Sequence, residues 1–196
     1  GALHWLVDEP GVHTAVVGGP TRVESSRSLA HDGLRTRVVH GEVVATVADH
    51  AEHPEGELQV QLLRLGPREL ASALLLPRDA DPDAPLPVLL DPYGGPHAQR
   101  GVRSLGAFTA SQWFADQGYA VVVIDGRGTP GRGPRFERAV WGDLAQPVLD
   151  DQLTALDAVA DEYPGMDLER VGIEPHGKDR PTLDIQQMPR SRVASV

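Results

Sequence analysis

The residues 85–100, PLPVLLDPYGGPHAQR, and 108–128, FTASQWFADQGYAVVVIDGRG, decide the fold of this chain. Each stretch contains a short apolar run, Val88–Leu90 in the first and Ala120–Ile124 in the second. Apolar runs of this length that are bounded by turn residues are typical of strands buried on both faces of a largely parallel sheet. The two stretches therefore predict two buried strands of an α/β sheet.

Both runs end in a turn that opens with an aspartate and is rich in glycine and proline, Asp91–Gly95 and Asp125–Gly131. In open α/β sheets, ligands bind at the carboxyl edge of the strands, where such turns lie. These two turns are therefore the first candidates for a functional site.

The sequence also predicts two helices and a further strand in this part of the chain. Residues 105–117 predict a helix that ends at Gly118, and residues 148–163 predict an amphipathic helix that Pro164 and Gly165 stop. Residues 171–173 begin a further strand. The apolar positions that we assign to the first helix are Phe108, Trp113 and Phe114. Strands that alternate with helices indicate an α/β fold with parallel strands.

The N-terminal part, residues 4–76, has a different pattern. Short β-prone pieces are separated by glycine or aspartate turns every eight to twelve residues, which favours antiparallel β structure. The clearest hairpin is expected around His40–Glu42. A charged, proline-rich loop at residues 78–85 separates this part from the α/β pattern.

Composition limits the possible partners. The 196 residues carry a net charge of −10, which argues against nucleic acid because phosphate binding needs a basic surface. No apolar run approaches the roughly 18 residues of a membrane span, so no membrane partner is expected. The absence of cysteine and of a visible signal peptide favours the cytoplasm, although the chain begins without methionine and we expect its true N-terminus to be missing. Nothing in the sequence indicates an oligomeric state.

The second turn formally matches a nucleotide-binding motif. Residues 126–131, GRGTPG, fit G-x-G-x-x-G directly after a strand. However, Pro130 removes one backbone amide, and Gly131 and Gly133 delay the helix whose N-terminus would hold a pyrophosphate. Nucleotide binding stays open as a less favoured alternative.

The sequence does not indicate a metal site or a serine nucleophile. His50 and His53 lie in a polar loop without a third ligand nearby, and His97 is as well explained by a structural role in its turn, so we predict no metal and no cofactor. A serine hydrolase needs a G-x-S-x-G elbow, which places the nucleophile on a strained strand-to-helix turn. None of the serines has that context: Ser25, Ser26, Ser28, Ser72, Ser104, Ser111, Ser191 and Ser195.

Several blocks closely resemble the dipeptidyl peptidase IV branch of the prolyl oligopeptidase superfamily of serine peptidases. They are LDPYGGP at residues 90–96, the helix with Trp113, the run at residues 121–133, and DDQ at residues 150–152. The resemblance implies an incomplete α/β-hydrolase sheet preceded by short antiparallel strands from the end of a β-propeller. It also implies short peptides as substrates of the intact relative, and it identifies Arg127 as similar to a structural arginine of the family.

In this family the tyrosine of the YGGP-like turn offers its hydroxyl to the oxyanion of the tetrahedral intermediate, and this tyrosine corresponds to Tyr93. A preorganised donor aimed at developing charge lowers a reaction barrier. The resemblance therefore implies that Tyr93 forms part of an oxyanion hole. The alternative is that Tyr93 only forms a pocket wall.

The sequence departs from the family after residue 173. Relatives continue with a G-W-S-x-G-G elbow, whereas this chain has Glu174–Lys178, EPHGK, and no nucleophile, aspartate or histidine of a triad can be assigned. We therefore expect three parts: residues 1–66 from a propeller, residues 67–173 from a hydrolase domain, and a divergent, disordered tail at residues 174–196. The expected function is that of an inactive serine peptidase fragment, with a non-catalytic binding module as the alternative.

Overall fold

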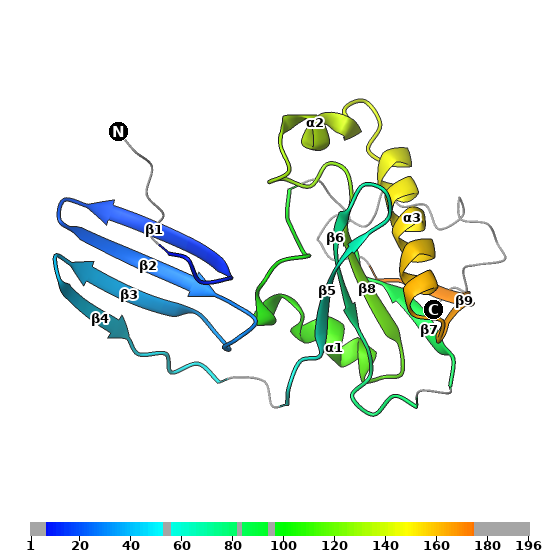
Figure 1. Ribbon diagram of the computed structural model, residues 1–196, viewed down its shortest axis with the longest axis horizontal. Coiled ribbons are helices and arrows are strands. Elements are labelled where there is room, and N and C mark those ends of the chain that lie inside the picture. The colour runs from blue at the N-terminus through cyan, green and yellow to red at the C-terminus, as the bar shows by residue number, and fades with distance from the viewer. Residues whose placement is uncertain (1–6, 53–55, 82–83, 94–96, 175–196) are drawn as a thin grey trace. The chain divides into compact units, whose positions relative to one another are not determined.

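The computed structural model describes residues 7–52, 56–81, 84–93 and 97–174 (Figure 1). Its contacts divide the chain into two compact units. The first unit comprises residues 1–58 and 102–109, and the second comprises residues 59–101 and 110–196. No helix in the described ranges is long and apolar enough to cross a membrane.

The first unit contains a four-stranded antiparallel sheet in which each strand pairs with the next along the chain. Its strands are β1 (Val12–Gly18), β2 (Thr21–Arg27), β3 (Arg35–His40) and β4 (Val43–Val47). The predicted hairpin joins β3 to β4, and Gly41 adopts a φ of +58° there, which suits a tight hairpin turn. The antiparallel β structure predicted for this region is confirmed.

The second unit contains a five-stranded sheet with the order β5-β6-β8-β7-β9. Its strands are β5 (Val60–Leu65), β6 (Leu70–Leu75), β7 (Leu86–Leu90), β8 (Ala120–Asp125) and β9 (Met166–Ile173). The strands β8, β7 and β9 are parallel, whereas β5, β6 and β8 pair antiparallel. The sheet is therefore mixed, because the β5–β6 hairpin adds to one side of the three parallel strands.

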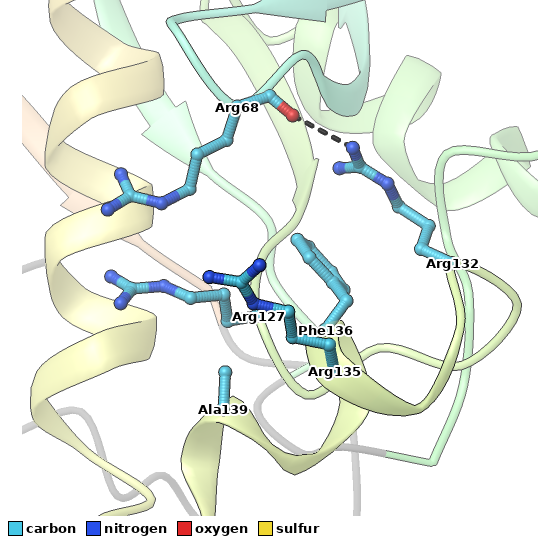
Figure 2. Close-up of a pocket in the computed structure, with 6 residues that line it drawn as sticks. All are labelled: Arg68, Arg127, Arg132, Arg135, Phe136 and Ala139. Atoms are coloured by element: carbon cyan, nitrogen blue, oxygen red, sulfur yellow. Dashed lines mark hydrogen bonds between the residues drawn. The ribbon is translucent and has the colours of Figure 1, made fainter.

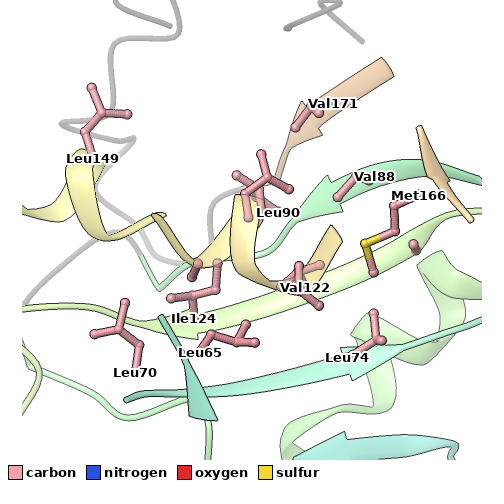
Figure 3. Close-up of a cluster of buried hydrophobic side chains, with 14 residues drawn as sticks. Leu65, Leu70, Leu74, Val88, Leu90, Val122, Ile124, Leu149, Met166 and Val171 are labelled. Atoms are coloured by element: carbon pink, nitrogen blue, oxygen red, sulfur yellow. The ribbon is translucent and has the colours of Figure 1, made fainter. Parts of the chain in front are cut away.

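The two central strands are buried as their apolar runs predict. All six residues of β8 are buried, and so are the last three residues of β7. On one face, side chains of the strands and of helix α3 (Gln146–Glu162) form a continuous hydrophobic core (Figure 3). The intervening residues, such as Val121 and Val123, are also fully buried. Both faces of β8 are therefore covered.

Helix α3 begins and ends where the sequence pattern predicts, within about two residues. Before it, Oδ1 of Asp143 accepts hydrogen bonds from the N–H groups of Ala145 and Gln146, which satisfies donors that the first turn leaves free. Pro147 occupies the first turn, where a missing N–H costs nothing. The helix buries Leu149, Ala155, Leu156 and Val159 against the sheet.

The first predicted helix is shorter than expected. It comprises a 3-10 turn (Leu105–Ala107) and α1 (Thr109–Ala115), and Gly118 after it has a φ of +98°, as the predicted cap requires. Phe108 is fully buried, but Trp113 is 59% exposed. Trp113, one of the apolar positions of the predicted helix, is therefore not part of the core, and α1 buries the polar residues Ser111 and Gln112.

Strand β5 belongs to the second sheet although it lies within residues 1–66, which we expected to form a separate part. The assignment of residues 1–66 and 67–173 to two domains stays a prediction. The tail that we expected at residues 174–196 lies, except for Glu174, outside the described residues. The N–H of Glu174 donates to the carbonyl oxygen of Leu90 at 2.9 Å and so continues the pairing of β9 with β7.

Candidate functional site

The first candidate turn is fixed by a buried ion pair. Asp91, directly after β7, is fully buried and accepts two hydrogen bonds from the guanidinium group of Arg100, at 3.2 and 2.8 Å. The hydroxyl of Ser111 on α1 donates to the same carboxylate at 2.6 Å. A bidentate arginine and carboxylate pair is both strong and geometrically specific. The two ends of the loop at residues 91–100 are therefore tied together by their own side chains.

The aspartate of the second turn holds the far end of the same loop. Oδ1 of Asp125 accepts the N–H of Arg100 at 2.8 Å, and Oδ2 accepts the N–H of Gly101 at 2.9 Å. Burial raises the pKa of the Asp125 carboxyl above its ordinary value of 3.8, although these two N–H donors and the Arg100 charge act in the opposite direction. A Cβ atom on Gly101 would lie 2.9 Å from the carbonyl oxygen of Ala71, so only glycine allows this close approach.

These contacts change the interpretation of the two aspartates. The sequence identified Asp91 and Asp125 as the first residues of candidate ligand-binding turns, but both carboxylates are used to anchor the loop. Tyr93 lies in this anchored loop and is half-buried. Residues 94–96, the rest of the YGGP block, lie outside the described residues. The contacts of Asp91 and Asp125 thus hold the backbone near Tyr93 in place at the carboxyl edge of β7.

Arg127 is held by hydrogen bonds, as its resemblance to a structural arginine implies. Its Nε donates to both oxygens of the fully buried Asp151, at 3.1 and 3.0 Å, and its guanidinium also donates to the carbonyl oxygen of Pro147 at 2.9 Å. Its backbone N–H donates to Asp151 at 2.7 Å. The second turn is therefore attached to the start of helix α3.

The backbone amides of the glycine-rich turn are occupied within the chain. The N–H of Gly128 donates to Phe136, that of Thr129 to Gly126, and that of Gly131 to the carboxylate of Glu137. The helix that follows, α2 (Pro134–Glu137), has only four residues. A pyrophosphate needs free amides at a helix N-terminus, so this turn does not have the geometry of a dinucleotide site.

The two candidate turns border one hollow of about 630 Å³. His97 comes from the loop at residues 91–100, just after the first turn, and Gly128 comes from the second turn. The segment after α2 contributes Trp141 and Leu144, which are 89% and 54% exposed. The structure therefore brings both predicted turns to the same place at the carboxyl edge of the sheet.

The remaining candidate residues do not form a catalytic or metal site. His50 and His97 are exposed, and His53 lies outside the described residues. The described ranges contain no group of three or more side chains that could hold a metal ion. No serine is hydrogen-bonded to a histidine in the described part of the chain, and Ser111 is fully buried against Asp91. Ser191 and Ser195 fall in the range that the structure does not describe.

Sequence reasoning missed the residues that build this site. Arg100, Ser111 and Asp151 form its anchoring contacts, and none of them was a candidate for a defined role. One signal was available, because a serine and a glutamine on the same short helix as Trp113 and Phe114 suggest a polar face that is satisfied by partners. The partners themselves come from distant parts of the sequence.

Comparisons with known proteins match both halves of the second unit. The sequence profile of the prolyl oligopeptidase family matches residues 107–176, and the profile of the X-Pro dipeptidyl-peptidase family (S15) matches residues 66–137. Mouse dipeptidyl peptidase 8 is 40% identical over 114 residues, which cover 55% of this chain and 12% of the relative. Dipeptidyl aminopeptidase BIII of Pseudoxanthomonas mexicana is 39% identical over 95 residues, which cover 45% of this chain and 13% of the relative.

A comparison of the fold with solved structures also finds a dipeptidyl peptidase. The crystal structure of Porphyromonas gingivalis dipeptidyl peptidase 4 superposes with a TM-score of 0.70 and 25% identity, over 83% of this chain and 25% of that one. This chain thus spans about an eighth of the length of the curated relatives it matches. The α/β sheet, the matched profiles and these relatives support a likeness of the second unit to the prolyl oligopeptidase family, and to its dipeptidyl peptidase IV branch.

Proposed function

We propose that this chain is part of a serine peptidase that hydrolyses short peptides by acyl transfer, and that the whole enzyme releases N-terminal dipeptides after proline or alanine. In this proposal, residues 1–66 form the end of a β-propeller and residues 67–173 form the first part of an α/β-hydrolase domain. Residues 174–196 follow as a divergent tail. The names of the matched dipeptidyl peptidases support the substrate class.

The observation that carries the proposal is the anchored loop with Tyr93 at the carboxyl edge of β7. Asp91 and Asp125 fix this loop through Arg100 and Gly101, and ligands of α/β sheets bind at this edge. A donor held in place before the reaction needs no reorganisation when charge develops, which is the condition for electrostatic catalysis. The geometry of the loop therefore supports a role for Tyr93 in binding an oxyanion.

The chemistry assigned to Tyr93 follows from acyl transfer. A nucleophilic oxygen attacks the carbonyl carbon of the scissile peptide bond, and the π electron pair moves onto the carbonyl oxygen. The hydroxyl of Tyr93 donates a hydrogen bond to this oxyanion. The oxyanion pair then re-forms the carbonyl as the C–N bond breaks. The amine leaves with the proton that the general base took from the nucleophile, and water later hydrolyses the acyl intermediate.

The 196-residue polypeptide supplies the donor but not the nucleophile, since EPHGK follows residue 173 where relatives carry the serine elbow. Removing a nucleophile leaves only residual catalysis from binding and the oxyanion hole. We therefore propose that this polypeptide is inactive on its own. The edge of β9 that faces away from β7 pairs with no strand in the described ranges, which supports further strands in the whole domain.

Two purified proteins test the proposal. The first is the 196-residue chain, which is expected neither to hydrolyse a Gly-Pro or Ala-Pro chromogenic amide nor to react with a fluorophosphonate. The second is a chimaera in which residues 1–173 continue into the matching C-terminal part of the Pseudoxanthomonas relative, and it is expected to do both. Activity or labelling of the first protein would refute the proposed inactivity. A folded chimaera that cleaves neither amide would refute the proposed peptidase function.

The gene gives an independent test of the tail. The nucleotide sequence after the codon of Ile173 can be translated in all three frames. A G-W-S-x-G-G elbow in another frame would support a fragment of an active peptidase. Continuous in-frame coverage without such an elbow would instead favour a non-catalytic binding module.

A further inference from the structure

A second hollow in the second unit is lined by arginines. It has a volume of about 460 Å³, and its walls are Arg68, Arg127, Arg132, Arg135, Phe136 and Ala139 (Figure 2). Arg68 comes from the turn between β5 and β6, Arg127 lies two residues after the end of β8, and the other four residues lie in or next to α2. We call this hollow the arginine pocket. It is large enough for a small-molecule ligand.

The positive charge of the arginine pocket is only partly balanced. Asp151 is bonded to Arg127 and lies 3.6 Å from Arg68, and Asp150 lies 3.7 Å from Arg127. Arg132 and Arg135 have no carboxylate within 4.0 Å among the described residues. Four guanidinium groups therefore face two carboxylates. This excess is notable because the chain as a whole carries a net charge of −10.

Several of these cations are held in place. Arg132 donates to the carbonyl oxygen of Arg68 at 2.9 Å, and its guanidinium carbon lies 4.3 Å from the centre of the Phe136 ring. Arg127 is fixed by Asp151 and is 19% exposed. A guanidinium group has five N–H donors in a planar fork, so these bonds leave donors free for a ligand. Positioned guanidinium groups favour planar or tetrahedral oxyanions such as phosphate.

We propose that the arginine pocket binds a phosphate group, free or as an ester, through the side chains of Arg132 and Arg135 with support from Arg68. This site uses guanidinium groups and does not depend on the amides of the glycine-rich turn, which are occupied within the chain. It lies outside the anchored loop of Tyr93. The proposal does not depend on the peptidase function.

Isothermal titration calorimetry on the 196-residue chain tests this site, with inorganic phosphate and phenyl phosphate as probes at constant ionic strength. Both probes are expected to bind saturably with one site per chain, and tighter binding of phenyl phosphate would identify an ester as the ligand. The double variant Arg132→Gln/Arg135→Gln is expected to bind roughly tenfold more weakly or worse, because two charge-assisted contacts are lost.

The matched control is the double variant Arg35→Gln/Arg103→Gln. It removes the same charge from two exposed arginines that have no ion pair among the described residues. Its affinity is expected to stay within about twofold of the original chain, since exposed charges at a distance are screened by salt. Circular dichroism shows whether each variant is folded, and Arg135→Gln alone replaces the double variant if that one does not fold.

The proposal is overturned if neither probe binds saturably, or if the two double variants lose affinity equally. An equal loss would mean that the anion responds only to net charge. Arg132→Lys/Arg135→Lys gives a further test, because lysine keeps the charge but lacks the planar fork. Its affinity is expected to fall between those of the original chain and the glutamine variant, and full retention would contradict the proposed arginine geometry.

Discussion

Asp91 and Asp125 stand at the ends of neighbouring strands and share one partner segment, Arg100–Gly101. The side chain of Arg100 is bonded to Asp91, while its backbone N–H is bonded to Asp125. Removing one partner of a buried charged pair leaves the other without compensation, which is more costly than the pair is favourable. The position of Tyr93 therefore depends on residues that do not take part in chemistry.

We predict that Tyr93→Phe lowers kcat of the chimaera described above by about 10²- to 10³-fold, the usual loss for one oxyanion donor, with little change in KM. The matched control is Tyr119→Phe, since Tyr119 directly precedes β8, at the other end of the strand from Asp125, and makes no hydrogen bond through its hydroxyl in the described part of the chain. Steady-state kinetics with the Ala-Pro amide measure both variants. Equal activity of Tyr93→Phe and the control would show that Tyr93 only forms a wall.

The raised pKa of Asp125 predicts a pH dependence of stability. The folded chain holds this proton more tightly than the unfolded chain does, so the contribution of Asp125 to the free energy of unfolding falls as pH rises above about 4. Asp125→Asn cannot titrate. We therefore expect the stability of the original chain relative to this variant to be greatest below about pH 4 and to decrease as the pH rises through the raised pKa. Urea unfolding at a series of pH values measures this difference, and a difference that grows with pH would contradict the assignment.

At the scale of elements, helix α3 and strand β8 were predictable because their apolar residues are numerous and regularly spaced. Strand β2, TRVESSR, was not predicted, since most of its side chains are polar. It forms because it pairs with both β1 and β3, and its buried Glu24 is bonded to Arg22 and Arg37. Pairing between strands and the matching of buried charges leave no periodic signal in the sequence.

Helix α1 is a second example of buried polar contacts that the sequence pattern does not reveal. Gln112 accepts the N–H of Gln59 at 2.8 Å and donates to the carbonyl oxygen of Leu76 at 3.1 Å. These bonds make a buried glutamine favourable on the face where an apolar pattern alone would place Trp113. The turns of the candidate site were located correctly from the sequence, but the roles of their aspartates depended on partners that only the fold brings near.

The packing of α3 predicts a large effect of one substitution. Leu156 is 1% exposed within the core, so Leu156→Ala is expected to lower the free energy of unfolding by about 2 to 5 kcal/mol. The same change at the 54% exposed Leu144 serves as a control and is expected to cost no more than about 0.5 kcal/mol. Denaturant unfolding measures both variants. Similar losses at the two positions would mean that α3 is not packed on the sheet.

For the whole molecule, the two units differ in how much they bury. The core cluster of the second unit includes residues of every one of its strands and of α3. In the first unit, β1 and β4 have no fully buried residue, and Val16, Val17 and Val43 are more than half exposed. Stability is therefore expected to be uneven along the chain.

Hydrogen exchange of the native chain tests this difference. Amides of β8, whose six residues are all buried, are expected to exchange slowly, and amides of β1 are expected to exchange orders of magnitude faster. Amides of β6, whose residues 71–75 pair with β8, serve as an internal reference within the second unit. Equal protection of β1 and β8 would indicate a single cooperative unit.

The strand order of the second sheet also has a consequence for synthesis on the ribosome. The hairpin β5–β6 can form early, but Ala71 meets Asp125 and Leu90 meets Ile173 only after long intervening segments have been made. At a translation rate of about 5 to 20 residues per second, the apolar face of β6 waits for seconds before β8 can cover it. Pairings of such high contact order are slow, so the nascent chain exposes an open strand edge during this interval. Binding of a general chaperone to ribosome-bound chains is accordingly expected to peak before residue 125 leaves the exit tunnel.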